Sequence, residues 1–210
     1  MPVCSRCTGI YIGFLASLCI LMAVERKIRS GFPPKKLTIS FIIFFSLMAA
    51  ESVLSFLGLT PALNILRFAT GYLAGWFISP MIIGLANSVS LDKKLLNNGS
   101  YLKNIKPLAI WVTAIIPFAA LFYFTFEKAI IFWSVFSLTG LVLFIALMVF
   151  IIVFASSRQL ANSLTSPGKY ILFLFISILI SAAFILLSST LKTAVNPYIR
   201  LFVLGLLPER

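Results

Sequence analysis

The hydrophobic pattern of the chain consists of six long apolar runs separated by short polar stretches. A helix needs about 20 apolar residues to cross the hydrocarbon core of a bilayer, and these runs are close to that length. The pattern therefore predicts an all-α fold, a polytopic transmembrane helix bundle that forms one domain over residues 1–210. The predicted spans are residues 8–24, 37–57, 62–86, 107–126, 129–155 and 170–191.

A last apolar run, Tyr198–Leu207, is too short to cross a membrane. Asn196 and Pro197 precede it, which is the pattern of a helix cap followed by a proline in the first turn. The sequence therefore predicts a short C-terminal helix that lies at the membrane interface or folds over the bundle.

The composition indicates that the chain lies in a lipid bilayer, so lipid is its first predicted partner. Hydrophobic residues make up 61% of the sequence and charged residues only 10%, which is too few to cover a water-facing surface. The net charge of +12 raises the question of nucleic-acid binding. The basic residues, however, lie in the short gaps between apolar runs and form no continuous basic segment, which argues against a nucleic-acid partner.

The distribution of basic residues predicts the orientation of the chain. Eleven of the 17 lie in the loops after the first, third and fifth spans. By the positive-inside rule these loops are cytoplasmic, and both termini lie outside the cytoplasm. We expect a multi-pass protein of the plasma (inner) membrane.

Chemistry within this sequence is restricted, because it contains no histidine and only five acidic residues. Histidine-dependent catalysis and histidine-ligated metals are excluded for these residues. Cys4 and Cys7 adjoin the first span and leave four alternatives open: a structural disulfide, a redox-active pair, a metal site, or no bond. A helix N-terminus and Arg6 would lower a thiol pKa here. The sequence requires no cofactor, and a metal would have to use Cys4 and Cys7.

Two charged residues, Glu51 and Arg67, lie within apolar spans. Each is eight residues from Leu59, the centre of the predicted turn Gly58–Pro61. Residues equidistant from the turn of a helical hairpin lie at the same depth, so we expect Glu51 and Arg67 to pair in the outer leaflet. The pair could lock the hairpin or belong to a functional site.

Small residues predict how the first and third spans pack. Gly9 and Gly13 in the first span, and Gly71 and Gly75 in the third, have the spacing that lets two helix backbones approach closely. Docking these two spans on each other would gather polar residues at their outer ends. This set comprises Cys4, Arg6, Cys7, Glu51, Asn64 and Arg67.

The motif Pro2-x-Cys4-x-Arg6-Cys7-Thr8-Gly9-Ile10-Tyr11-x-Gly13 resembles the signature of domain of unknown function 2085, a family of uncharacterised prokaryotic membrane proteins. The resemblance continues at Glu51 and at Asn64-x-x-Arg67-x-x-Thr70-Gly71, and covers roughly the first 75 residues. It implies a polytopic membrane protein and brings no established activity. It also implies a segment before the motif with a Cys-His element, which would favour a metal or haem.

Three functions are compatible with these residues. The leading hypothesis is a non-enzymatic protein that binds or transports a small anionic or lipid-like ligand. Its site would use Arg6 and Arg67 for the anionic group, Glu51 as the counter-charge, and Thr8, Asn64 and Thr70 as hydrogen-bond partners.

The second hypothesis is a membrane thiol–disulfide oxidoreductase that uses Cys4 and Cys7 and exchanges electrons with a lipid-soluble carrier. The third is a structural subunit of a membrane complex or a homo-oligomer. In that case a disulfide and an ion pair would only hold the chain together. The sequence does not name a ligand.

Overall fold

The structure is a computed structural model that describes residues 4–25, 29–31, 33–58, 63–90, 97–156 and 167–206. Most of the predicted turn Gly58–Pro61, several basic loop residues and Leu207 lie outside these ranges. The elements, in chain order, are α1 (Ser5–Val24), β1 (Arg29–Gly31), α2 (Lys35–Phe56), α3 (Asn64–Ser90), β2 (Asn97–Ser100), α4 (Ile105–Thr113), α5 (Ile115–Thr125), α6 (Ile130–Ser156) and α8 (Pro167–Leu206).

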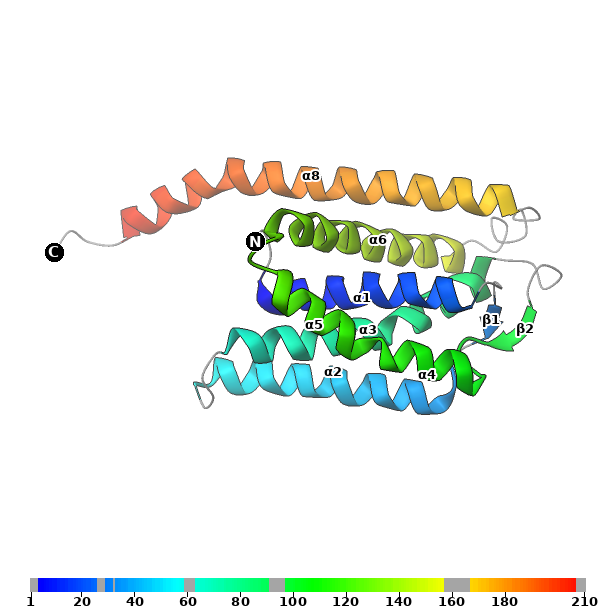
Figure 1. Cartoon of the computed structure of the whole chain (residues 1–210). Coiled ribbons are helices and arrows are strands. Elements are labelled where there is room, and N and C mark those ends of the chain that lie inside the picture. The colour runs from blue at the N-terminus through cyan, green and yellow to red at the C-terminus, as the bar shows by residue number, and fades with distance from the viewer. Residues whose placement is uncertain are drawn as a thin grey trace.

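The described residues form an all-α bundle with six helical stretches long and apolar enough to cross a membrane. Five of them are single helices, and the remaining stretch combines α4 and α5. Successive stretches run in opposite directions along the bundle, so the start of α1 and the end of α8 lie at the same end (Figure 1). The end of α2 and the start of α3 lie at this end too, whereas β1 and β2 lie at the opposite end.

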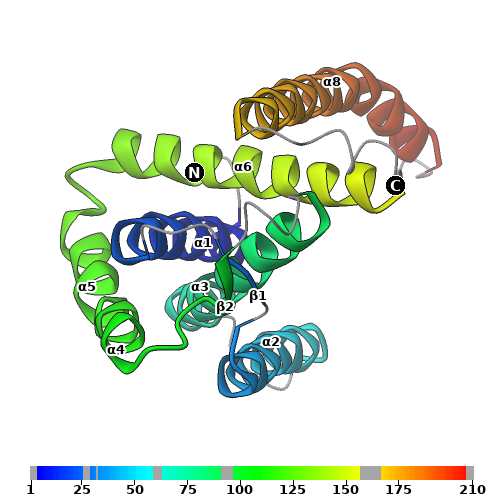
Figure 2. The same ribbon diagram turned by 90° about the vertical axis from the view of Figure 1, so that its right-hand side faces the viewer.

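Helix α1 lies at the centre of the bundle, between α3 and α6 (Figure 2). Most of α1 and α3 is buried, whereas α2 lies outside α3 and α8 outside α6, with large apolar side chains exposed. In a membrane these exposed side chains face lipid, since a bilayer solvates apolar surface as well as another helix does. The central pair α1 and α3 therefore positions the polar residues described below.

The contact between α1 and α3 depends on glycine. A Cβ at Gly9 or Gly13 would collide with backbone atoms of Phe68 or Tyr72 on α3. Equally, a Cβ at Gly71 or Gly75 would collide with the Arg6 or Ile10 carbonyl of α1. The four glycines singled out in the sequence thus lie in one seam where the two backbones touch. Gly140 of α6 makes a similar close approach to Tyr11 on the other side of α1.

A proline in α3 explains a hydrogen-bond chain in the middle of the bundle. Pro80 has no N–H, so the carbonyl of Trp76 four residues earlier loses its helical donor. The Ser17 hydroxyl of α1 donates to that carbonyl at 2.8 Å and accepts from Trp111 Nε1 at 3.1 Å. All four residues are buried, and this chain of hydrogen bonds joins α1, α3 and α4 inside the bundle.

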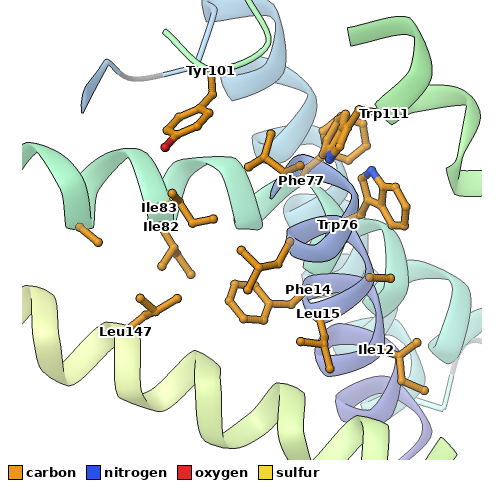
Figure 3. Close-up of a cluster of buried hydrophobic side chains, with 14 of the residues drawn as sticks. Ile12, Phe14, Leu15, Trp76, Phe77, Ile82, Ile83, Tyr101, Trp111 and Leu147 are labelled. Carbon is orange, nitrogen blue, oxygen red and sulfur yellow. The ribbon is translucent and has the colours of Figure 1, made fainter. Parts of the chain in front are cut away.

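Aromatic packing surrounds this chain. The rings of Trp76 and Trp111 have centroids 5.7 Å apart, and Phe77 meets Trp111 edge to face at 5.4 Å. Figure 3 shows these three side chains together, with Phe14 and Leu15 of α1 beside them. The cluster holds α4 against the central pair of helices.

Replacing Ser17 with Ala is expected to lower the free energy of unfolding by about 1 kcal/mol, because it leaves the Trp76 carbonyl and the Trp111 indole without a partner. Thermal unfolding in detergent, followed by tryptophan fluorescence, measures the change. Ser40 is the matched control, since its hydroxyl donates only to Lys36 within α2. Equal stability of the two alanine variants would contradict the stabilising role given to the hydrogen bonds of Ser17.

The fourth predicted span is broken into two helices. The α4 helix ends at Thr113 and α5 begins at Ile115. Pro117 lacks the N–H that would bond to the Thr113 carbonyl, so a bend is expected at this point. Tyr72 of α3 donates its hydroxyl to the Ile115 carbonyl at 3.1 Å and fixes the break against the central helices.

At the end opposite the N-terminus the structure contains features that the sequence pattern did not predict. The strands β1 and β2 pair in parallel. The buried Glu25 carboxylate, just after α1, accepts from the Leu102 N–H at 3.0 Å. Asn87 of α3 donates to the Tyr101 hydroxyl at 2.9 Å and accepts from the Tyr170 hydroxyl at 3.0 Å. These bonds tie together α1, α3, α8 and the turn before α4.

The separate C-terminal helix predicted for Tyr198–Leu207 needs correction. The sixth span and the last apolar run form one helix, α8, from Pro167 to Leu206. Asn196 and Pro197 thus lie inside a helix rather than at its start. Proline interrupts one helical hydrogen bond without ending the helix, which accords with the bend of α8 near its C-terminal end in Figure 1.

Candidate functional site

The predicted pair of intramembrane charges is an ion-pair cluster of three residues. Glu51 lies near the end of α2, Arg67 in the first turn of α3, and Arg6 in the first turn of α1. Arg6 Nη2 donates to Glu51 Oε2, and Arg67 Nε lies 3.6 Å from Glu51 Oε1. The equal distance of Glu51 and Arg67 from the hairpin turn thus placed them together. The glycine seam adds Arg6, because it docks the start of α1 beside α3.

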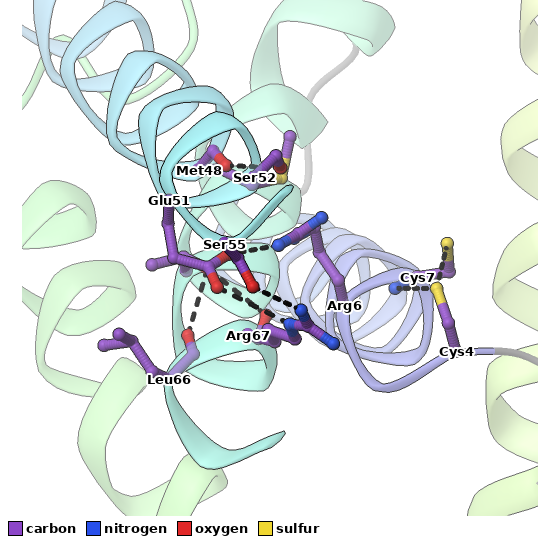
Figure 4. Close-up of polar contacts among 10 residues, drawn as sticks. Cys4, Arg6, Cys7, Met48, Glu51, Ser52, Ser55, Leu66 and Arg67 are labelled. Atoms are coloured by element: carbon purple, nitrogen blue, oxygen red, sulfur yellow. Dashed lines mark hydrogen bonds and ion pairs between the residues drawn. The ribbon is translucent and has the colours of Figure 1, made fainter. Parts of the chain in front are cut away.

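Ser55 is a member of this cluster that the sequence reasoning missed. Arg67 Nη2 donates to its hydroxyl at 2.6 Å. The signal was present in the sequence, because Ser55 follows Glu51 by four residues and so lies on the same face of α2. Figure 4 shows Glu51 and Ser55 on α2 facing the arginine side chains.

The cluster has more hydrogen-bond donors than acceptors. Two guanidiniums carry five N–H donors each, whereas Glu51 and Ser55 are the described side chains that accept from them. Arg6 Nε and Arg67 Nε are buried and have no hydrogen-bond partner among the described residues. Two positive charges face one negative charge, so a charge of about +1 is left over.

Two helix N-termini add to this positive character. Both α1 and α3 begin at the cluster, at Ser5 and Asn64. The first turn of a helix carries unpaired N–H groups and the positive end of the helix dipole. The arrangement therefore suits an anionic group, which would supply the missing acceptors and the missing negative charge.

Two other predicted site residues, Asn64 and Thr70, have no hydrogen bond to the charged side chains of Glu51 and the arginines among the described residues. Asn64 is exposed, and no side-chain hydrogen bond connects it to the part of the chain that the structure describes. The Thr70 hydroxyl donates to the Leu66 and Arg67 carbonyls of its own helix. Thr8 is buried in α1. Their role in binding stays a prediction.

The two cysteines lie on a different side of α1 from the charged cluster. Figure 4 shows Cys4 and Cys7 on one side of the helix and Glu51 and Arg67 on the other. Arg6 points toward Glu51 of α2, whereas the sulfur atoms of Cys4, the N-cap residue, and Cys7 lie together on the other side of α1. The expectation that docking would place the cysteines over the charges is therefore wrong, and the chain presents two separate polar features.

The cysteine pair is positioned by the start of α1. Cys4 is the N-cap residue, and its Sγ accepts from the Cys7 N–H at 3.4 Å. The two Sγ atoms are 2.7 Å apart. Cys4 is exposed and Cys7 half-buried, so a reagent or partner can reach the first sulfur more easily. Among the described residues no three histidine, cysteine or acidic side chains form a group that could hold a metal.

The surroundings of Cys4 lower its pKa. Partial burial raises the pKa, but it is outweighed by hydrogen bonds from the Cys7 thiol and backbone together with the influence of Arg6. The positive charge of Arg6 thus contributes to the lowered pKa. A lowered pKa gives more thiolate, the reactive form of cysteine.

Alkylation of Cys4 is expected to reach its half-maximal rate at a lower pH than alkylation of an ordinary exposed cysteine, because the thiolate forms at a lower pH. Iodoacetamide labelling of the reduced protein across pH, resolved by mass spectrometry, measures this midpoint. In Arg6→Gln the midpoint should move to higher pH, and in Lys128→Gln, a charge change in the turn after α5, it should not. An ordinary midpoint in the unmodified chain would contradict the assigned thiolate stabilisation.

The N-terminal part of the chain, which carries both polar features, is similar in sequence to known proteins. Residues 1–81 match the family of predicted membrane proteins DUF2085. The matched part contains the cysteine pair, the glycine seam and all four residues of the charged cluster. It covers α1, α2 and most of α3, so the resemblance seen in the sequence motifs is confirmed.

One relative is an uncharacterized protein of Methanocaldococcus jannaschii, MJ1492, which is 35% identical over 78 residues. The aligned part is 37% of this chain and 48% of the relative, so the chain covers about half of the relative's length. No solved structure matches the chain. The comparisons thus show that the N-terminal part of the chain resembles predicted membrane proteins, and they name no activity.

Proposed function

We propose that this membrane protein binds an anionic group of a small or lipid-like ligand at the cluster of Arg6, Glu51, Ser55 and Arg67. The observation that carries the proposal is the surplus of donors, with two guanidiniums facing one carboxylate and one hydroxyl. Unpaired buried donors cost on the order of 1–3 kcal/mol each, and an anion would remove that cost. Binding of the anion involves no chemical reaction, so we assign no catalytic residue.

The test uses dodecyl phosphate as the probe and thermal unfolding of the detergent-solubilised full chain as the readout. We expect dodecyl phosphate to raise the unfolding temperature of the unmodified chain, because a bound ligand stabilises the folded state. In Arg67→Gln the remaining Arg6 and Glu51 charges cancel, so the shift should be lost while Glu51 stays paired. Lys128→Gln is the control with the same charge change. Equal shifts in Arg67→Gln and Lys128→Gln would overturn the proposal.

A thiol–disulfide oxidoreductase is the second candidate, favoured by the 2.7 Å separation of the Cys4 and Cys7 sulfurs. When the S–S bond forms, the Cys4 thiolate and the Cys7 thiol together lose two electrons and one proton. A lipid-soluble quinone would accept these electrons, with that proton and one from water, and become a quinol. Incubating the reduced protein with decylubiquinone should then form one quinol per disulfide. No quinol in the unmodified chain, or the same amount in Cys7→Ser, would overturn this candidate.

The end with the cysteines and the charged cluster is proposed to face away from the cytoplasm of a plasma membrane. Support comes from the opposite end, where the described basic residues are concentrated: Arg29, Lys35, Lys36, Lys103, Lys106 and Lys169. A membrane-impermeant maleimide added to intact cells after mild reduction should label Cys4. Labelling that requires opened membranes would mean the reverse orientation.

A further inference from the structure

We infer that the anionic group bound at the charged cluster is the phosphate of a membrane phospholipid, rather than an ion from the water phase. This inference rests on the proposed function, since it names the ligand of the same site. It is carried by three observations: the apolar surface around the cluster, its position along the helices, and its charge.

The surface beside the cluster is apolar and exposed. Residues near the end of α2 and the start of α3 present large hydrophobic side chains outward, and the Phe56 side chain is 90% exposed. These side chains lie at the end of α2 and the start of α3, the helices that carry Glu51 and Arg67: Phe56, Leu57, Leu63, Ile65 and Leu66. A soluble ion would have to reach the arginines past a surface that is itself solvated by lipid. A phospholipid already lies against that surface with its acyl chains.

The cluster has the depth of a lipid headgroup. Arg67 is three residues after the start of α3 at Asn64, which is about 4.5 Å along the helix axis. Arg6 is one residue after the start of α1. The headgroup region on each side of a bilayer is about 5–7 Å thick. Arginine side chains reach toward the interface at such positions, so both guanidiniums can meet a phosphate there.

Charge and shape agree with a phosphodiester. Arg6 and Arg67 with Glu51 leave a charge of about +1, and a phosphodiester carries one negative charge. The planar fork of a guanidinium matches two phosphate oxygens, whereas each arginine here uses only part of its fork on Glu51 or Ser55. The carboxylate of Glu51 remains the fixed counter-charge that holds both arginines in place.

The experiment uses the full chain in lipid nanodiscs with spin-labelled phosphatidylglycerol or phosphatidylcholine. Both lipids contain phosphate, but only phosphatidylglycerol has a net negative charge. Electron paramagnetic resonance gives the fraction of each labelled lipid immobilised by the protein. We expect the association of phosphatidylglycerol to exceed that of phosphatidylcholine by about tenfold, a difference of about 1.4 kcal/mol. The preference should disappear in Arg67→Gln and remain in Lys128→Gln.

Should Arg67→Gln fail to fold, Arg67→Lys decides the question, because it keeps the charge and loses the fork. A preference lowered in Arg67→Lys supports the inference, and an unchanged preference in Arg67→Lys or Arg67→Gln overturns it. No preference in the unmodified chain also overturns it.

Inorganic phosphate separates this inference from the proposed function. If it displaces labelled phosphatidylglycerol when chloride of equal ionic strength does not, the site takes a free anion. The inference of a phospholipid ligand is then wrong, whereas the proposed binding of an anion still holds. If dodecyl phosphate gives no stabilisation that depends on Arg67, the anion site itself is wrong. Stabilisation by dodecyl phosphate together with no displacement by inorganic phosphate is the result expected for a phospholipid site.

Discussion

Replacing Glu51 with Gln is expected to lower the free energy of unfolding by about 2–3 kcal/mol, less than for a fully buried pair because the arginines are partly exposed. Glutamine has nearly the same shape, so the loss comes from two guanidiniums left without their carboxylate. Unfolding of the detergent-solubilised protein measures the change. Glu127→Gln, an exposed charge change in the turn after α5, is the control and should have little effect.

The same variant connects stability with ligand binding. In Glu51→Gln a bound phosphate would supply the negative charge that the side chain has lost. Dodecyl phosphate should therefore stabilise Glu51→Gln more than it stabilises the unmodified chain. If Glu51→Gln is as stable as Glu127→Gln, the cluster does not hold the three helices together. If it is destabilised but the probe does not restore it, the arginines do not bind the anion.

The other large effect is expected at the helix seam. Replacing Gly75 with Leu should abolish the folded bundle or lower its free energy of unfolding by more than about 3 kcal/mol, because even a Cβ there would collide with the Ile10 carbonyl. Such a clash pushes α1 away from α3 and also separates Arg6 from Glu51. Folded yield by size-exclusion chromatography and thermal unfolding are the measurements.

Ala69→Leu is the matched control for the seam, since Ala69 is an exposed residue of the same helix and the added side chain would face lipid. It should behave like the unmodified chain. A Gly75→Leu protein with unchanged yield and unfolding temperature would show that α1 and α3 are not in backbone contact at this position.

The sequence was sufficient to predict the features that depend on helical geometry alone. Apolar length gave the six spans, and glycine spacing indicated the contact between α1 and α3. The equal distance of Glu51 and Arg67 from one turn placed them together. Each of these features follows from the fixed rise and periodicity of a straight helix.

Features that depend on side-chain direction or on distant contacts were not predicted. Cys7 follows Arg6 by one residue in α1 and so points in a different direction around the helix, which equal depth along the helix does not reveal. The hydrogen bond from Ser17 to the Trp76 carbonyl depends on which helix packs against α3 near Pro80. The order of the spans along the chain does not predict that neighbour. The contact between Glu25 and Leu102 joins residues 77 positions apart, beyond any local pattern.

The C-terminal part shows the limit of local signals. Asn196 and Pro197 have the composition of a helix start, yet α8 continues through them from Pro167 to Leu206. A proline in the interior of a helix removes one hydrogen bond, and membrane helices tolerate this more often than soluble ones. Capping signals are therefore weaker indicators of a helix boundary within apolar sequences.

An experimental structure of the full chain in nanodiscs that contain phosphatidylglycerol tests the central claim most directly. We predict density for a phosphate that lies about 3 Å from nitrogen atoms of both Arg6 and Arg67, with Glu51 still beside them. Guanidiniums whose donors are all satisfied by protein groups, with no other density at the cluster, would contradict the assignment of an anion-binding site.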